Sequence, residues 1–75
     1  MTTFYEICVQ DHLDQRWSDW FLDLTFRHTF RSDGQPITIL SGEIQDQSAL
    51  SGILIQLGDL GFTLISVNQK KGDLS

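Results

Sequence analysis

The sequence predicts an α+β fold in which a four-stranded antiparallel sheet carries two helices on one face. Apolar residues recur at the spacing of an amphipathic helix between Leu50 and Leu60. Elsewhere the chain alternates apolar and polar residues in the manner of strands, and Asp33-Gly34 marks a hairpin turn. These segments follow one another as strand, helix, strand, strand, helix, strand, within one domain that spans residues 1–75.

The first strand is expected from Thr3 to Gln10. Tyr5, Ile7 and Val9 form an apolar face that we place toward the helices. Cys8 then lies on the opposite face of the sheet. We interpret it as a small packing residue, because no neighbour in the sequence would lower its pKa and make it reactive.

A short helix is expected after a turn at Asp11 to Asp14, whose carboxylates suit a helix start. Spacing of i, i+4, i+7 and i+8 places four bulky residues on one buried face: Leu13, Trp17, Trp20 and Phe21. We interpret both tryptophans as core residues. A stacking platform for bases or sugars is the alternative, but a small domain needs bulky side chains in its core.

A hairpin follows, with strands over residues 24–31 and Ile37 to Ile44. If Asp33-Gly34 formed the whole loop, Ile37 and Ile39 would face the core. A longer loop would shift the register and turn Leu40 and Ile44 inward instead. We favour the longer loop.

The second helix begins at Asp46 or Ser48, either of which can accept hydrogen bonds from the first turn. Its apolar stripe consists of Leu50, Ile53, Leu54, Leu57 and Leu60. Gly61 suits a left-handed helix cap, and residues 62–67 read as the last strand. A polar, frayed tail is expected over about residues 69–75.

Ile55 points away from the apolar stripe of this helix, on the side of Ser48, Gly52 and Asp59. It is either an ordinary exposed apolar residue or the centre of a flat patch that another chain could cover. Gly52 and Gly58, inside the helix, each cost about 1 kcal/mol relative to alanine.

The predicted order of elements is that of the ferredoxin-like βαββαβ arrangement. It leaves one face of the sheet without helices. With the longer hairpin loop, this face carries Cys8, Ile39 and Leu64 among residues such as Arg27. Because partly apolar open faces are usually hidden by a partner, these residues, with Ile55 on the helix, are the candidate interaction surface.

Composition narrows the classes of function. A net charge of −5 repels phosphate, so we expect no binding of nucleic acid or anionic membranes. One cysteine forms no internal disulfide, and there is no long apolar run or signal sequence, so we expect a cytoplasmic protein. With 75 residues the core is marginal, which favours a homodimer.

The sequence contains no catalytic motif and no phosphate-binding loop. His12 and His28 lack the spacing of metal ligands, so we expect neither a metal site nor a cofactor. His28 is interpreted as a hydrogen-bonded structural residue and His12 as a turn residue. If the protein were a cofactor-free enzyme, Tyr5, Cys8 and His28 would be the candidates to line its pocket.

Eight short motifs resemble those of a group of small, uncharacterised bacterial proteins: Tyr5-Glu6-Ile7, His12-Leu13-Asp14, Arg16-Trp17, Trp20-Phe21, Leu24-Thr25, Leu40-Ser41-Gly42, Asp46 to Gly52, and Asp59-Leu60-Gly61. The resemblance covers nearly the whole chain except the hairpin loop and the tail. It implies a bacterial, cytoplasmic, single-domain protein and no particular activity. The chain has Ser51 where those proteins tend to have histidine, and Leu22-Asp23 where they have small residues.

Three functions remain open. The first, which we favour, is a non-enzymatic interaction module that forms a homodimer and contacts another protein. The second is a regulatory domain that binds a small ligand between subunits, an expectation from fold analogy alone. The third is a cofactor-free enzyme.

Overall fold

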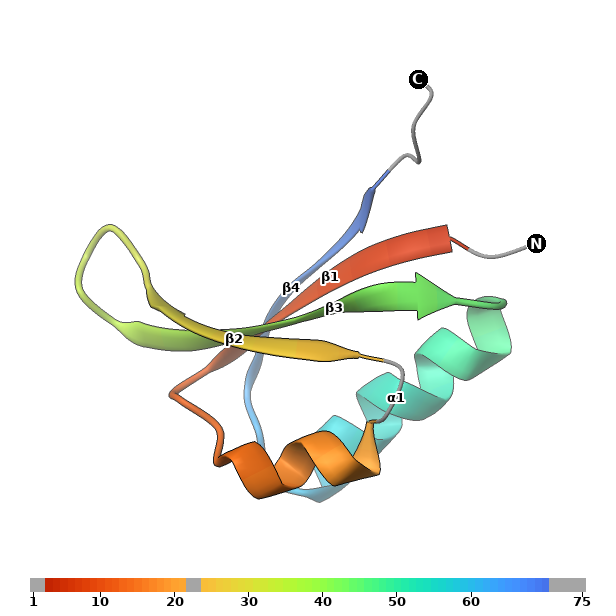
Figure 1. Ribbon diagram of the computed structural model, residues 1–75, viewed down its shortest axis with the longest axis horizontal. Helices are drawn as coiled ribbons and strands as arrows, with labels where there is room; N and C mark the ends of the chain where they lie inside the picture. Colours follow the sequence, from red (N-terminus) through yellow and green to blue (C-terminus); the bar gives the residue numbers. More distant parts are fainter. Residues whose placement is uncertain (1–2, 22–23, 71–75) are drawn as a thin grey trace.

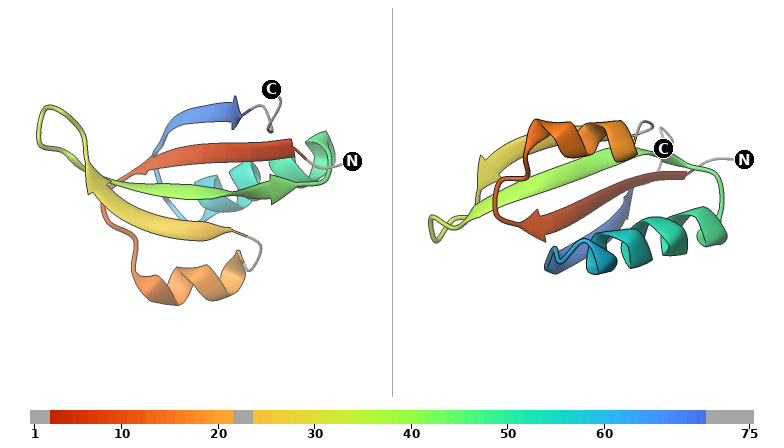
Figure 2. Two further views of the ribbon diagram at one scale, coloured as in Figure 1. Left: turned by 45° about the horizontal axis from the view of Figure 1, so that its top comes forward. Right: turned by 90° about the horizontal axis from the view of Figure 1, so that it is seen from below.

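The structure is a computed structural model that describes residues 3–21 and 24–70. Its elements are β1 (Thr3–Gln10), the 3-10 helix η1 (Gln15–Trp20), β2 (Thr25–Phe30), β3 (Pro36–Ile44), α1 (Gln47–Asp59) and β4 (Leu64–Lys70). The four strands form one sheet in the order β2-β3-β1-β4, and all neighbours are antiparallel. Both helical elements lie on the same face of this sheet, η1 toward β2 and α1 toward β4 (Figures 1 and 2).

The predicted α+β class and the four-stranded antiparallel sheet are confirmed. The expectation of a ferredoxin-like βαββαβ fold with two α-helices is wrong, because α1 is the one main helix of the described residues. Among the described residues of the connection between β1 and β2, the helical element is the six-residue η1. The open face of the sheet is nevertheless present, since both helical elements cover the other side (Figure 2).

The segment η1 is a 3-10 helix, because its hydrogen bonds span three residues instead of four. Asp14 accepts a hydrogen bond from the backbone N–H of Arg16, and the N–H of Trp17 donates to the carbonyl of Asp14. A 3-10 helix has three residues per turn, so the α-helical spacing no longer applies. Leu13 and Phe21 are buried as predicted, but Trp17 is half-buried and Trp20 is 58% exposed. The prediction that Trp20 is a core residue is therefore wrong.

The helix α1 agrees with its sequence signals. Asp46 is its N-cap, accepting a hydrogen bond of 2.8 Å from the N–H of Ala49. At the other end Gly61 has φ +89°, and the N–H of Phe62 donates to the carbonyl of Leu57. This is the predicted left-handed cap, in which the chain reverses and satisfies the last carbonyl groups. Leu57 is almost completely buried beneath the sheet.

The hairpin has the longer loop that we favoured. Phe30 pairs with Pro36, and the five residues between them form the loop. Gly34, at φ +89°, and a hydrogen bond from the N–H of Gln35 to the Asp33 carboxylate hold the turn. As predicted for this register, the core-facing residues of β3 include Leu40 (0% exposed) and Ile44 (4% exposed).

The last strand is longer than predicted at its C-terminal end. It pairs with β1 up to Lys70, which lies opposite Phe4. The expected frayed tail is therefore wrong for residues 69 and 70, while residues 71–75 lie outside the described residues. At the other end the pairing of β4 is irregular between Cys8 and Val9, next to Leu64.

Candidate interaction surface

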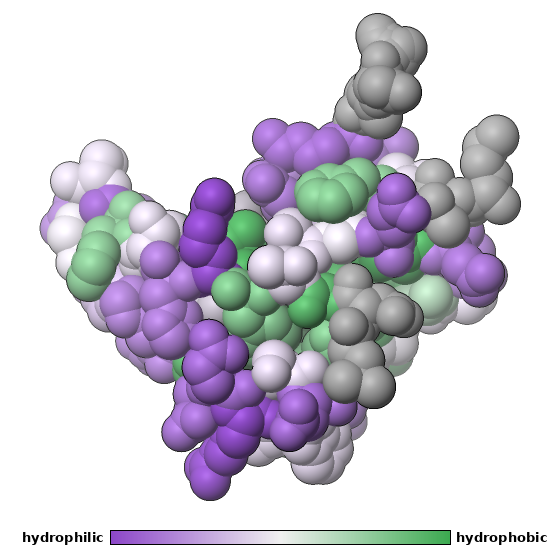
Figure 3. All heavy atoms as spheres, in the orientation of Figure 1, coloured by the Kyte–Doolittle hydropathy of each residue, from purple (hydrophilic) through white to green (hydrophobic). Residues whose placement is uncertain are grey.

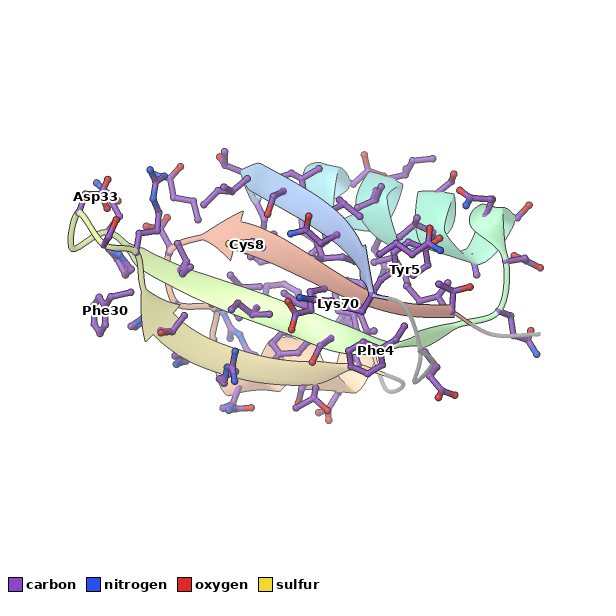
Figure 4. All side chains as sticks on the ribbon, turned by 90° about the horizontal axis from the view of Figure 1, so that it is seen from above. Phe4, Tyr5, Cys8, Phe30, Asp33 and Lys70 are labelled. Carbon is purple, nitrogen blue, oxygen red and sulfur yellow. The ribbon has the colours of Figure 1, made fainter. Side chains whose placement is uncertain are left out.

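The open face of the sheet is built from rows of side chains that cross all four strands. Arg27 pairs with Ile39, Ile39 with Cys8, and Cys8 with Ser66, which gives one continuous row from β2 to β4. This row lies on the side away from the helices, because the neighbouring β1 residues Ile7 and Val9 are the buried ones. Figure 4 looks onto this face and shows Cys8 near its centre.

We call the open face the surface formed by this row and the rows beside it. The next row toward the chain termini contains Thr25, Ser41, Glu6 and Asn68, and the one after it contains Glu43, Phe4 and Lys70. Phe4 is 38% exposed. The Lys70 ammonium lies 3.6 Å from the Glu6 carboxylate, so these two charges are paired at the surface (Figure 4).

The hairpin end of the open face is more polar. Here an open pocket of about 260 Å³ is lined by Gln10, Arg31, Asp33, Gln35, Ile37 and Ile65. The Arg31 guanidinium and the Asp33 carboxylate are 3.4 Å apart and already neutralise one another. Arg27 forms no ion pair within residues 3–21 and 24–70, so it is the cation of this face that is available to a partner.

Burial raises the pKa of the Cys8 thiol above its ordinary value. The positive charge of Arg31 and a hydrogen bond with the Ser66 side chain act in the opposite direction but are smaller. The thiol is therefore protonated at neutral pH, which disfavours nucleophilic chemistry.

The residues predicted to form the interaction surface do not all lie together. Cys8, Arg27 and Ile39 share one row of the open face. Ile55 is 64% exposed, but it belongs to α1, on the other side of the sheet. Leu64, at the first position of β4 beside the irregular pairing, is 45% exposed but lies opposite Val9, in a helix-side row and not on the open face as predicted.

The predicted pocket residues Tyr5 and His28 do not converge. Tyr5 is 6% exposed, and its hydroxyl accepts a hydrogen bond of 3.2 Å from the Gln47 side chain. His28 lies in the same row as Val9, because both pair with Thr38, so it is four positions along the sheet from Tyr5. Neither residue lines the hairpin pocket or a second open pocket, of about 340 Å³, between β3 and α1.

The two histidines instead form hydrogen bonds that hold the segment following β1 against strand β2. The Nε2–H of His28 donates to the carbonyl of Leu13 at 2.6 Å, and that of His12 donates to the carbonyl of Thr29 at 2.9 Å. Because a carbonyl only accepts, Nε2 carries the hydrogen in both rings. The rings are stacked with centroids 4.6 Å apart. His28 is hydrogen-bonded as predicted, although it is exposed.

Sequence reasoning did not select four residues that contribute to the open face: Phe4, Ile37, Ser66 and Ile65. Strand alternation already placed Phe4 on the side of Cys8, so that signal was available. Ile37 and Ser66 required the correct hairpin register and the pairing of β4 with β1, which no local pattern specifies. Figure 3 shows a different side of the molecule, where apolar atoms gather in the middle of the visible surface, below β2, with hydrophilic side chains around them.

In the part of the chain that the structure describes, no group of three or more His, Cys, Asp or Glu side chains is placed to hold a metal ion. Nor do the described residues include a helix long and apolar enough to cross a membrane.

Comparison with known proteins identifies the family. Neither the curated proteins nor the solved structures contain a match to this chain. Residues 4–68, from β1 to the middle of β4, match the profile of a family described as a domain of unknown function, DUF8691. This agrees with the resemblance to small uncharacterised proteins. The chain belongs to the DUF8691 family of domains of unknown function.

Proposed function

We propose that the protein is a non-enzymatic interaction module that forms a homodimer and binds another protein through the open face. The observation that carries this proposal is the row Arg27–Ile39–Cys8, in which a cation, an aliphatic side chain and a protonated thiol lie side by side without a covering layer. Partly apolar sheet faces of this kind commonly mark a protein contact.

The polar groups of the helix side support the same proposal. The Thr38 hydroxyl, the Tyr5 hydroxyl and both imidazoles have partners within the chain. None of the buried side-chain nitrogen or oxygen atoms of the described residues lacks a hydrogen bond. A site for a small ligand or for catalysis usually offers polar groups that converge on a cavity. Here such groups instead form hydrogen bonds within the chain that stabilise the fold.

Arg27 indicates one feature of the partner's contact surface. The chain as a whole has a net charge of −5, but Arg27 is an exposed cation beside Ile39 and Cys8. A matching surface would place a carboxylate opposite Arg27 and apolar side chains opposite Ile39 and Phe4. The partner is therefore a protein whose contact surface combines apolar side chains with a carboxylate placed to meet Arg27.

Native mass spectrometry of the gently purified protein tests the homodimer. The expected mass is twice that of the 8.6 kDa chain, without an additional small molecule. A dimer that carries a small extra mass would contradict the proposal and favour a ligand-binding domain. A monomer at every concentration measured would contradict the homodimer.

Matched variants test the open face. Ile39→Glu places a carboxylate in the centre of the face, and Ile55→Glu makes the same change on the exposed side of α1. A partner that binds the open face should be captured by the wild type and the Ile55 variant, and lost from the Ile39 variant. Arg27→Glu should weaken the same complex, and its affinity in the wild type should fall with salt. Equal capture of the partner by all variants would show that the partner does not bind the open face.

A further inference from the structure

The outer edge of β4 presents backbone groups that no described strand pairs with. The pairing pattern shows which groups these are. The N–H of Asp11 donates to the carbonyl of Pro36, and the N–H of Gln10 donates to the carbonyl of Thr63. Because hydrogen-bonded and non-hydrogen-bonded pairs alternate in antiparallel strands, odd-numbered residues of β1 bond to β3 and even-numbered residues bond to β4.

The same alternation assigns the backbone of β4. Ser66, Asn68 and Lys70 lie opposite Cys8, Glu6 and Phe4, so their N–H and C=O groups point toward β1. Val67 and Gln69 then direct theirs away from the sheet. An edge of this kind is a template for another strand unless charges, prolines or a covering segment block it.

The residues of β4 do little to block such pairing. Residues 64–70 contain no proline and no acidic residue, and their single charge is Lys70 at the end of the strand. Although the chain has a net charge of −5, two copies would therefore meet at this edge without repulsion between carboxylates of β4. The other edge strand, β2, contains Arg27 and is followed directly by Arg31.

We propose that β4 pairs with β4 of a second copy of this chain, antiparallel and across a two-fold axis at Val67. This inference rests on the proposed homodimer and names its interface. The two sheets would join into one sheet of eight strands, and the pairing would be isologous and closed. Pairing of β4 with β2 of another copy would instead leave a free edge on each copy, so that further copies could add without forming a closed assembly.

The side chains of β4 suit this register. Val67 lies opposite its own copy, Ser66 lies opposite Asn68 of the second copy, and Ile65 lies opposite Gln69. These are apolar or neutral polar pairs, and no like charges meet directly. Because α1 runs along the β4 side of the sheet (Figures 2 and 4), the same axis brings the two α1 helices toward one another.

A proline at Gln69 tests the edge directly. Its N–H points away from β1, so Gln69→Pro removes an outward donor without removing a bond to β1. The matched control is Gln69→Ala, which keeps the backbone donor and removes only the exposed side chain. Sedimentation should show a monomer for the proline variant and a dimer for the alanine variant. Thermal unfolding of the proline variant checks that it is folded.

Cysteine cross-linking tests the register. In a Cys8→Ser background, Val67→Cys should form an intermolecular disulfide under mild oxidation, because directly paired residues have Cα atoms about 5.5 Å apart. Gln69→Cys should not, since the two copies of residue 69 lie four positions apart along the strand. Efficient cross-linking at residue 69 with none at residue 67 would overturn the axis at Val67.

The outcomes separate this inference from the proposed function. A wild-type dimer that stays dimeric in the folded Gln69→Pro variant would overturn the β4 interface but leave the homodimer. A wild type that is monomeric throughout would contradict both. A wild type that forms long polymers, and loses them on charge reversal of Arg27, would indicate pairing between β4 and β2.

Discussion

The two faces of the sheet are built from the same strands but differ in what their side chains contact. On the helix side, Ile7 and Leu40 are completely buried, and Thr38 uses both its hydrogen-bonding capacities within the chain. On the open side, the adjacent residues Cys8 and Ile39 remain partly exposed. The comparison teaches that the helix-side face forms the core that stabilises the fold, whereas the centre of the open face stays partly exposed.

The largest expected effect is a difference in the free energy of unfolding between alanine variants of two neighbouring residues on β3. Leu40→Ala should lower the free energy of unfolding by about 2–5 kcal/mol, because it opens a cavity in the core. Ile39→Ala should cost clearly less, since its side chain is already partly hydrated. Chemical denaturation of both variants measures the difference. Equal losses would mean that the open face is covered in solution.

The second effect concerns a buried hydroxyl. The Thr38 hydroxyl accepts from the N–H of Leu13 at 2.9 Å and donates to the carbonyl of Asp11 at 2.8 Å. Thr38→Val keeps the shape but leaves that N–H unsatisfied, which should cost about 1–3 kcal/mol. Thr29→Val is the matched control on the open side and should be nearly neutral in thermal unfolding. A silent Thr38 variant would show that the connection after β1 is held by other bonds.

The third effect lies on the outside of α1. An added Cβ at Gly52 would meet no atom within 4 Å, so packing within the chain does not require glycine there. Gly52→Ala should raise the free energy of unfolding of the monomer by about 1 kcal/mol. Unfolding should be measured at low protein concentration, where association contributes nothing. A loss of stability would indicate that something approaches this helix closely.

The smallest effect is a change in thiol reactivity. Because its pKa is raised in the folded chain, Cys8 should be alkylated more slowly than in the unfolded chain, with its pH midpoint shifted upward. A folded pKa above the unfolded one stabilises the protein below the unfolded pKa, and this stabilisation is lost as pH rises through the folded pKa. Arg31→Gln should shift the midpoint still higher, since the guanidinium lowers the pKa. An unchanged midpoint in the folded protein would contradict this assignment.

The sequence predicted the elements whose signals are local. For α1, the apolar spacing, the Asp46 cap and Gly61 all agree, and each acts within a few residues. For η1, the same spacing suggested an α-helix and a buried Trp20. Because the chain between Asp14 and Phe21 forms a 3-10 helix, residues at that spacing no longer share one face, and only tertiary packing selects which aromatic residues remain inside.

The candidate surface was likewise predictable only where its sequence signals are local. Strand alternation placed Cys8 on the open side, and the favoured hairpin register placed Ile39 beside it. The position of Ser66 depends on the pairing of the last strand with the first, and no local pattern records it. The free edge of β4 follows from the same pairing, so it could not be read from the sequence.

The place of β1 in the sheet also determines when the fold can be completed. The first strand lies between β3 and β4, and Phe4 pairs with Lys70 near the end of the chain. During synthesis, β1 therefore stays unpaired on one side until the last strand has left the ribosome. Such distant pairing slows folding. Joining the two ends and opening the chain in the hairpin loop would convert β4 and β1 into a local hairpin, and this permuted protein should fold faster than the natural one.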